Sequence, residues 1–249
     1  MLPFRIAAAD LIIGAACAGC GRPAITLCDE CAPSFIPEPR EAWPRPAPAE
    51  LLGPKPVRPY ASAPYEGPVR SALACYKEQG QFGLLRILGH MLAASVCAVA
   101  PADSPLVLVP IPSARLASVR RGYDAIGELA RTAGEALRAI GLDCRVAAEL
   151  RQSRRVADQS GLGARERSAN MADALTIRSA APLRGRDVIV VDDIITTGAS
   201  IAEAVRVLDV AGCRPFGVAV VAVTERHAGR HPGTSDVAME KRPPGGYGR

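Results

Sequence analysis

The pattern of apolar and polar positions predicts alternating strands and helices in the middle of the chain. Continuous apolar runs are typical of buried strands, and they occur at 106–109, 188–191 and 217–223. Apolar residues at helical spacing predict helices at 66–79, 82–98, 123–140 and 201–212. Strands that alternate with helices indicate a parallel sheet covered by helices on both faces, which is an α/β fold.

The stretches on either side of this pattern have a different composition. Residues 37–59 are proline-rich and cannot form a helix or a central strand, so we expect a semi-rigid linker or an arm along the surface. Residues 229–249 are rich in Pro, Gly and charge, and we expect a disordered tail. The predicted units are therefore a cysteine knuckle at 1–36, the linker at 37–59, the α/β domain at 60–228 and the tail.

The segment 188–205, VIVVDDIITTGASIAEAV, has the residues of a sugar-phosphate site. Asp192 and Asp193 end a predicted parallel strand, where ligands bind, and carboxylates accept hydrogen bonds from sugar hydroxyls. The following turn (Thr196, Thr197, Gly198, Ala199 and Ser200) opens a helix, whose free N–H groups and dipole favour an anion. Each piece alone would fit an ordinary turn with a Thr or Ser cap. The whole string favours a ribose and its phosphate.

Two arginine-rich stretches could hold a further anion. Ser113 to Gly122 follows the strand at 106–109 and carries Arg115, Arg120 and Arg121 with no acid among them. Residues 151–170 are polar and weakly periodic and predict a mobile loop with Arg154, Arg155, Arg165 and Arg167, which could close over a charged leaving group. A solvated basic loop explains the first stretch equally simply, and a surface loop or a nucleic-acid contact would explain the second.

Four cysteines near the N-terminus form two CxxC pairs, Cys17-Cys20 and Cys28-Cys31. Four thiolates at this spacing can close a tetrahedral structural Zn²⁺ site. In a segment too short to have its own core, metal binding would supply folding energy. Paired disulfides and a redox CxxC are the alternatives.

The composition sets wider limits on location and partners. The net charge of +5 suits an anionic ligand or a nucleic acid and identifies neither. No stretch was expected to be long and apolar enough to span a bilayer. The first residues faintly resemble a signal peptide, but Asp10 interrupts the apolar run. We expect a short helix there and a cytoplasmic protein; secretion or lipid anchoring is the alternative.

The ribose string resembles the phosphoribosyl-pyrophosphate signature of type I phosphoribosyltransferases. Together with the other motifs, in this order, the chain from about residue 12 to residue 228 resembles the ComF family. The shared pieces are Cys17 to Cys31, Tyr65-Glu66-Gly67-Pro68, Val109 to Tyr123, Gln159-Ser160-Gly161-Leu162 through Arg167 and Asn170, and Val190 to Ser200. The resemblance implies a type I phosphoribosyltransferase fold with an N-terminal zinc-ribbon-like knuckle.

The resemblance also implies roles for individual residues. Asp192 and Asp193 would contact the ribose and Mg²⁺, and Thr196 to Ser200 would hold the 5-phosphate. Arg115 and Arg121 would bind pyrophosphate, while Arg154 or Arg167 would close from the second loop. One departure stands out: where ComF-like chains have Arg-Gly-Phe-Asn-Gln, this chain has Arg121-Gly122-Tyr123-Asp124-Ala125. The exchange removes two amides and adds a negative charge beside the expected pyrophosphate loop.

Three functions fit these features. The first is an enzyme that transfers the phosphoribosyl group of phosphoribosyl pyrophosphate (PRPP) to an acceptor, expected to be a base. The second is a non-catalytic ComF-like module that acts in DNA uptake, or transformation, by binding single-stranded DNA. Aromatic residues are only 4% of the chain, so few could stack on bases. The third is a sensor that binds PRPP without turnover.

Overall fold

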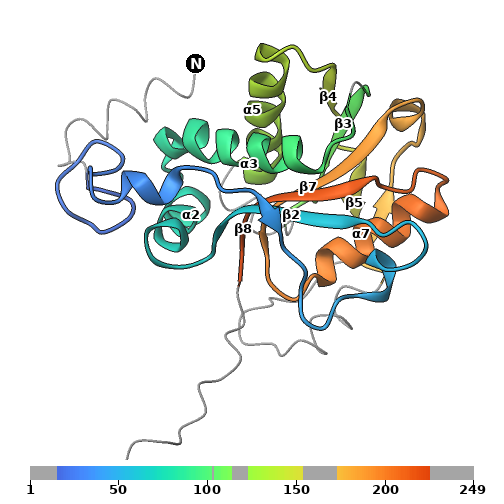
Figure 1. The fold of residues 1–249 in the computed structure, drawn as a ribbon, viewed down its shortest axis with the longest axis horizontal. Helices are drawn as coiled ribbons and strands as arrows, with labels where there is room; N and C mark the ends of the chain where they lie inside the picture. The colour runs from blue at the N-terminus through green and yellow to red at the C-terminus, as the bar shows by residue number, and fades with distance from the viewer. Residues whose placement is uncertain (1–15, 103, 114–122, 154–172, 225–249) are drawn as a thin grey trace, which may run out of the picture.

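The computed structural model describes residues 16–102, 104–113, 123–153 and 173–224. A six-stranded sheet in the order β1-β2-β8-β7-β3-β4 forms its centre, and all neighbours are parallel except β1 and β2 (Figure 1). Its strands are β1 (Arg40–Glu41), β2 (Arg58–Pro64), β3 (Leu106–Pro110), β4 (Cys144–Val146), β7 (Asp187–Ile195) and β8 (Gly217–Val223). A separate antiparallel pair joins β5 (Leu150–Gln152) to β6 (Leu175–Ile177).

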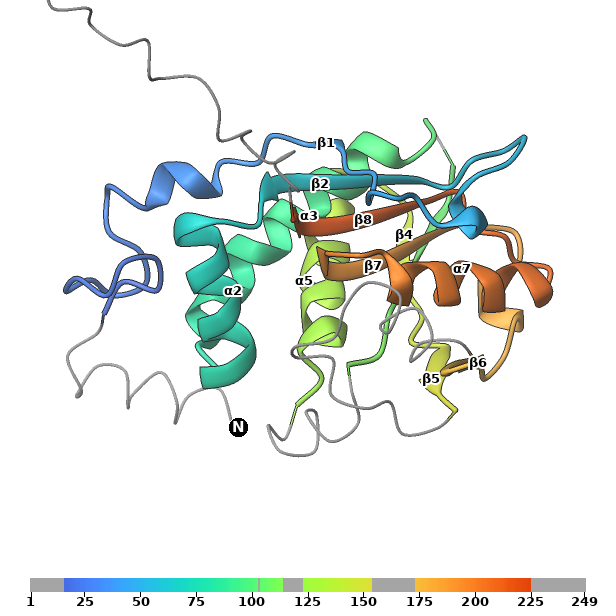
Figure 2. The ribbon, with the colours of Figure 1, turned by 90° about the horizontal axis from the view of Figure 1, so that it is seen from below.

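Helices lie on both faces of this sheet, as the alternating pattern predicted (Figure 2). α3 and α5 pack on one face and on each other, while α7 packs on the other face. The α-helices are α2 (Gly67–Gln79), α3 (Leu85–Val99), α5 (Ala125–Ala139) and α7 (Ala199–Val210). Short 3₁₀ helices occur at η1 (Ala32–Phe35), η2 (Ala49–Leu51), η3 (Phe82–Leu84) and η4 (Ala181–Leu183). The three predicted strands and four predicted helices all form, with ends shifted by a few residues.

The strands β3 and β8 and the 188–191 part of β7 are apolar at every position because both of their faces are buried. In β3, Leu106 and Leu108 belong to the core beneath α3 and α5, whereas Val107 and Val109 belong to the core beneath α7. Successive residues of a strand point to opposite faces, so a continuous apolar run fills two cores at once. This arrangement confirms the predicted α/β fold with a mostly parallel sheet.

One stretch corrects the expectation about membrane spans. Phe82–Val99 is long and apolar enough to cross a membrane by length and composition alone. Half of this window is buried inside the domain, and Leu88, Met91 and Leu92 are fully buried. α3 packs against both α5 and the sheet, and a core helix with this position is apolar for that reason.

The proline-rich segment 37–59 is bound to the domain along its length. Its β1 pairs with β2 through Arg40 and Glu41, and its Leu51 is fully buried in the core beneath α7. These are the contacts of an arm on the domain surface rather than of a free linker. The boundaries of the four units stay a prediction, and the expected N-terminal helix and tail lie outside the described residues.

The strand β2 was not expected, because its two prolines obscured the pattern. Pro59 keeps its carbonyl, which accepts a hydrogen bond from the Ala42 N–H at 2.8 Å. It lacks only the N–H donor, and β1 pairs with β2 over just two residues, so the missing donor disturbs little. The strands β4, β5 and β6 have three residues each, too few to show a period in the sequence.

Candidate functional site

The two acids of the ribose string lie where the sequence analysis expected them, near the carboxyl end of β7. Because β2, β8, β7 and β3 are parallel, their carboxyl ends meet at one edge of the sheet. Asp193 is buried, with 3% of its surface exposed, and Asp192 is half-buried. The Asp192 carboxylate accepts a hydrogen bond from the Asp193 N–H at 2.9 Å, which fixes its orientation.

A lysine that the sequence analysis did not single out completes this acid pair. Lys77 Nζ lies 2.7 Å from Asp193 Oδ2 and is partly exposed, while Asp193 is almost fully enclosed. Lys77 comes from α2, which follows β2 in the chain. A buried carboxylate needs a partner of opposite charge, and Lys77 supplies it from a distant part of the sequence.

The surroundings of the pair change the pKa of Asp192. Burial raises the pKa of Asp192 well above its usual range, and the neighbouring Asp193 raises it further, while Lys77 acts in the opposite sense. Two adjacent carboxylates cannot easily both carry charge in an enclosed site. A cation or a set of hydroxyl donors placed between them would relieve this repulsion. The oxygen donors fit Mg²⁺, which binds through one or two carboxylates and substrate oxygens.

The turn from β7 to α7 contains the residues that the sequence analysis predicts to hold the 5-phosphate. Residues 196–198 connect the strand to the helix, which starts at Ala199, and Gly198 has a left-handed φ of 76°. Thr196 is exposed and Ser200 is half-buried, so both hydroxyls lie near the surface. The first N–H groups of α7 have no partner within the helix and face outward along its axis. The predicted 5-phosphate residues therefore form one loop beside the two acids.

The structure gives Gly198 a second role that the sequence did not suggest. A Cβ at this position would lie 2.8 Å from Pro44 Cγ and 3.2 Å from Pro48 Cγ. The proline-rich arm thus packs against one side of the loop, with no room for a side chain between them. Gly198 is required for the arm's close approach, in addition to any approach of a phosphate.

The arginines expected to bind pyrophosphate cannot be placed in the same way. Arg115 and Arg121 lie outside the described residues, as do Arg154 and Arg167. The residue before the first basic stretch is described: Ser113 follows β3, at the same sheet edge as the acids. Its Oγ is buried and has no hydrogen-bond partner among the described residues. An unsatisfied buried hydroxyl at this edge is consistent with a polar ligand there.

The departure from the ComF pattern at Asp124 and Ala125 lies at the start of α5. Asp124 is exposed at the N-cap position, where the helix dipole favours a negative charge. Ala125 is fully buried, so a larger amide would not fit there without repacking. Both residues suit the beginning of this helix, which gives a structural reason for the exchange.

The end of α2 is joined to the start of α5 by two tyrosines. The Tyr76 hydroxyl donates to the Ala125 carbonyl at 2.8 Å, and the Tyr123 hydroxyl donates to the Tyr76 carbonyl at 2.5 Å. The Tyr123 ring also packs against Phe82. Tyr123 is the aromatic residue of the Arg-Gly-aromatic motif, and it is held against the turn of α2 that carries Lys77.

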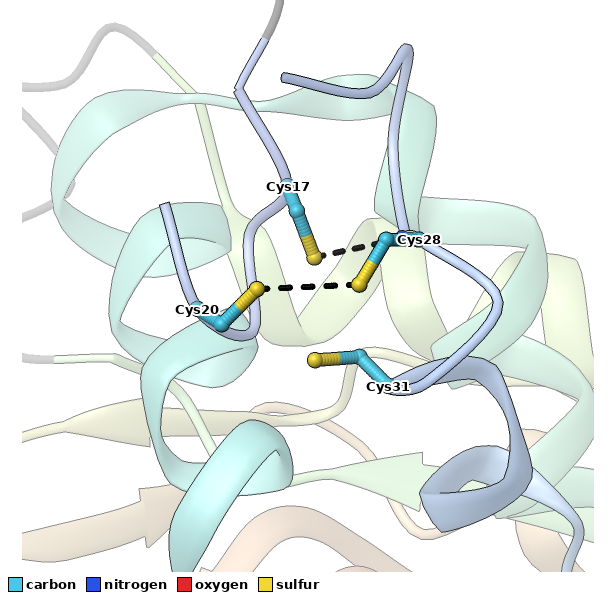
Figure 3. Close-up of side chains that lie close together, drawn as sticks. All are labelled: Cys17, Cys20, Cys28 and Cys31. Carbon is cyan, nitrogen blue, oxygen red and sulfur yellow. Dashed lines mark hydrogen bonds between the residues drawn. The ribbon is translucent and has the colours of Figure 1, made fainter. Parts of the chain in front are cut away.

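The four knuckle cysteines meet as the spacing predicted. The sulfur atoms of Cys17, Cys20, Cys28 and Cys31 all lie within 4.8 Å of one another and point to a common centre (Figure 3). Cys20 Sγ and Cys28 Sγ are 3.6 Å apart, close to the edge of about 3.8 Å of a tetrahedron with Zn–S bonds near 2.3 Å. All eight cysteines are free thiols, so the described chain contains no disulfide. The geometry and the donor set fit a structural Zn²⁺.

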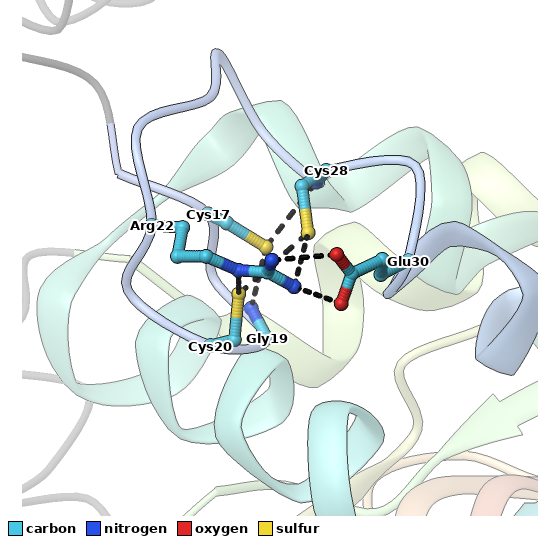
Figure 4. Close-up of polar contacts among 6 residues, drawn as sticks. All are labelled: Cys17, Gly19, Cys20, Arg22, Cys28 and Glu30. Carbon is cyan, nitrogen blue, oxygen red and sulfur yellow. Dashed lines mark hydrogen bonds and ion pairs between the residues drawn. The ribbon is translucent and has the colours of Figure 1, made fainter.

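Hydrogen bonds lower the pKa of Cys17 and Cys20 and so favour their thiolates, whereas burial and the neighbouring sulfurs raise the pKa of Cys31. Burial alone would raise the pKa of Cys17, but N–H groups of Cys28, Gly19 and Cys20 hydrogen-bond to its sulfur and lower the pKa to about 6. The Arg22 Nε donates to Cys20 Sγ at 3.4 Å, and its guanidinium is held by an ion pair with Glu30 (Figure 4). Arg22 therefore places a positive charge beside a site whose four thiolates would exceed the charge of Zn²⁺.

Sequence analysis missed Lys77 and Arg22 for different reasons. Arg22 lies between the two CxxC pairs, and its closeness in sequence could have drawn attention to it. Lys77 gives no local signal, because its partner Asp193 lies far away in the chain and only the packing of α2 joins them.

Comparison with known families matches residues 103–243, more than half of the chain, to the phosphoribosyl transferase domain. Shorter stretches are similar to orotate phosphoribosyltransferases. The identity is 50% over 40 residues with the protein of Xylella fastidiosa (strain M12) and 44% over 61 residues with that of Thioalkalivibrio sulfidiphilus (strain HL-EbGR7). These stretches cover 16% and 24% of this chain and only 18% and 28% of the relatives.

Proposed function

The chain belongs to the phosphoribosyl transferase domain family, and from this we propose that it binds PRPP with Mg²⁺ and transfers the phosphoribosyl group to an acceptor. One observation carries the proposal. Asp192 and Asp193 lie near the carboxyl end of β7, a few residues before the turn 196–198 and the start of α7, so acceptors for ribose hydroxyls and donors for a phosphate follow one another along the chain. An ordinary strand-to-helix turn has no need of two acids, one of them buried.

In the proposed reaction, the bond from the anomeric carbon to pyrophosphate breaks and a bond to the acceptor forms. Positive charge builds on the ribose as pyrophosphate leaves, so the site acts by positioning and by charge. Asp192 and Asp193 orient the ribose hydroxyls, and Thr196 to Ser200 hold the 5-phosphate. Bound Mg²⁺ would neutralise part of the pyrophosphate charge, with the two carboxylates as its protein ligands.

The basic stretches have roles in the same proposal. Arg115 and Arg121 follow the strand β3, the neighbour of β7, and they would face the pyrophosphate. Arg154 or Arg167 would approach from the second stretch and exclude water from the leaving group. Ser113, with its unpartnered hydroxyl at the start of the first stretch, would add a donor.

For the acceptor, we propose a base that reacts through a ring nitrogen. The curated relatives are named for orotate, and this makes orotate the first acceptor to test. The matched stretches span less than a third of those relatives, so a broader set of purine and pyrimidine bases belongs in the same screen.

The first test is calorimetric titration of the zinc-loaded protein with PRPP and Mg²⁺. The double variant Asp192→Ala, Asp193→Ala should lose saturable binding, because it lacks the ribose contacts. Asp209→Ala is the matched control, since Asp209 is an exposed acid at the other end of α7. Unchanged binding in the double variant, or none in the folded wild type, would refute the proposal. Magnesium-dependent pyrophosphate release with an added base would then separate an enzyme from a sensor.

A ComF-like role in DNA uptake is the second candidate, and the knuckle favours it. The four-cysteine cluster lies ahead of the matched domain and packs on α2, an order typical of the ComF-like pattern described above. This role predicts single-stranded DNA binding that weakens steeply with salt and survives Asp193→Ala. Binding of PRPP without any DNA binding would contradict this role. The free cysteines suit a reducing compartment, so a cytoplasmic location is part of both proposals.

A further inference from the structure

The contact between Lys77 and Asp193 joins two parts of the chain that the family match separates. Asp193 belongs to the matched domain at 103–243, whereas Lys77 lies on α2, well before it. The ammonium nitrogen is 2.7 Å from the buried carboxylate oxygen, and about a third of the Lys77 side chain (29%) is exposed. The Lys77 side chain therefore contacts a predicted ribose ligand through its ammonium and is partly exposed to solvent.

The same turn of α2 also contacts the predicted pyrophosphate region. Tyr76 accepts a hydrogen bond from the hydroxyl of Tyr123, which directly follows the basic stretch ending at Arg121-Gly122. The Tyr76 hydroxyl anchors this turn to α5 through the Ala125 carbonyl. Lys77 thus contacts Asp193, while its neighbour Tyr76 is joined to Tyr123, the residue that follows the predicted pyrophosphate stretch in sequence.

The chemistry of an ammonium group suits this position. It has three donors and no acceptor, so it can keep one contact with a carboxylate and offer another to an anion. Pyrophosphate brings several negative charges toward two acids that already repel each other. A fixed positive charge at this point lowers the cost of that approach.

We propose that Lys77 is a binding residue of the phosphoribosyl site, whose ammonium keeps its ion pair with Asp193 and donates a hydrogen bond to a pyrophosphate oxygen of PRPP. The inference rests on the proposed function. It gives α2, outside the matched domain, a direct part in ligand binding.

Calorimetric titration with two ligands tests this inference, each in the presence of Mg²⁺: PRPP, which carries pyrophosphate, and ribose 5-phosphate, which does not. Lys77→Gln should weaken PRPP binding by roughly tenfold to a hundredfold, the usual loss for a hydrogen bond to a charged group. Ribose 5-phosphate binding should change by less than about threefold, and Lys77→Arg should recover part of the loss. Arg70→Gln removes the same charge from an exposed position on α2 and should leave both affinities unchanged.

Loss of Lys77 leaves a buried carboxylate without its cation, so the variant could lose stability instead of a ligand contact. The double variant Lys77→Gln, Asp193→Asn removes both charges. Compared with Asp193→Asn alone, it should still lose affinity for PRPP and not for ribose 5-phosphate. Equal losses for the two ligands, or no loss for PRPP, would overturn the inference while the proposed function stands. A folded wild type that binds neither ligand would overturn the proposed function itself.

Discussion

At the scale of single residues, Gly198 links the phosphate loop to the proline-rich arm. Its φ of 76° is in the left-handed region, and Pro44 occupies the space that a Cβ would need. Gly185 has a similar φ of 72° but nothing within 4 Å of its Cβ position. Substitutions at the two glycines can therefore separate the cost of backbone strain from the cost of losing the contact with the arm.

We expect Gly198→Ala to lower the free energy of unfolding by about 2–4 kcal/mol, from strain of about 1–3 kcal/mol together with overpacking. Gly185→Ala should lower the free energy of unfolding only by the cost of the backbone strain. Urea unfolding monitored by circular dichroism measures both. Equal losses in the two variants would show that the arm moves away at no cost. In that case the contact with Pro44 would not hold the loop in place.

At the scale of elements, the arm contributes buried side chains to the core beneath α7, among them Ala42, Leu51 and Val57. Leu51 in η2 is fully buried beneath α7, whereas the next residue, Leu52, is 48% exposed. Arg214 binds the arm from the other side, through the Glu50 and Lys55 carbonyls, each at 3.4 Å. A segment with these contacts contributes to the core although its composition is that of a linker.

We expect Leu51→Ala to reduce the free energy of unfolding by about 2–5 kcal/mol, because it leaves a cavity in the core. Leu52→Ala should change it by less than about 0.5 kcal/mol, as for most surface substitutions. Chemical unfolding of both variants makes the comparison. Should Leu51→Ala be as stable as wild type, residues 37–59 would be a linker that rests loosely on the domain.

At the scale of the whole molecule, the knuckle is part of the packing around α2. A Cβ on Gly19 would lie 2.8 Å from Cys31 Sγ and 3.0 Å from Pro68 Cβ, so the cysteine loop is pressed against the start of this helix. Ala18 and Phe35 from the knuckle side belong to the same core as α3 and α5. A folded knuckle should therefore stabilise the domain as well as the knuckle.

We expect Cys31→Ser to lose the bound Zn²⁺ and to lower Tm by roughly 5–10 °C, because each kcal/mol of lost metal-binding energy shifts Tm by about 2–4 °C at this size. Cys97→Ser is the control, since Cys97 is exposed on α3, away from the cluster. Metal content and thermal unfolding are measured together. A zinc-free variant with the same Tm as the wild type would mean that the knuckle and the domain unfold independently.

The sequence by itself determined the local features of this protein. The apolar runs of β3, β7 and β8 were long enough to predict buried strands, and the string around Asp192 and Asp193 predicted the site because its residues are adjacent in the chain. The two CxxC pairs predicted the sulfur cluster for the same reason. Such signals depend only on the order of neighbouring residues, which the sequence states directly.

Only the tertiary structure decided which distant segments meet. The pairing of Lys77 with Asp193, the packing of Pro44 on Gly198 and the place of β2 between β1 and β8 leave no local pattern. Each depends on how α2 and the arm fold back onto the sheet, and this is set by the burial of residues such as Tyr76 and Leu51. Burial is a property of the whole packed chain, so contacts made through it cannot be read from one segment alone.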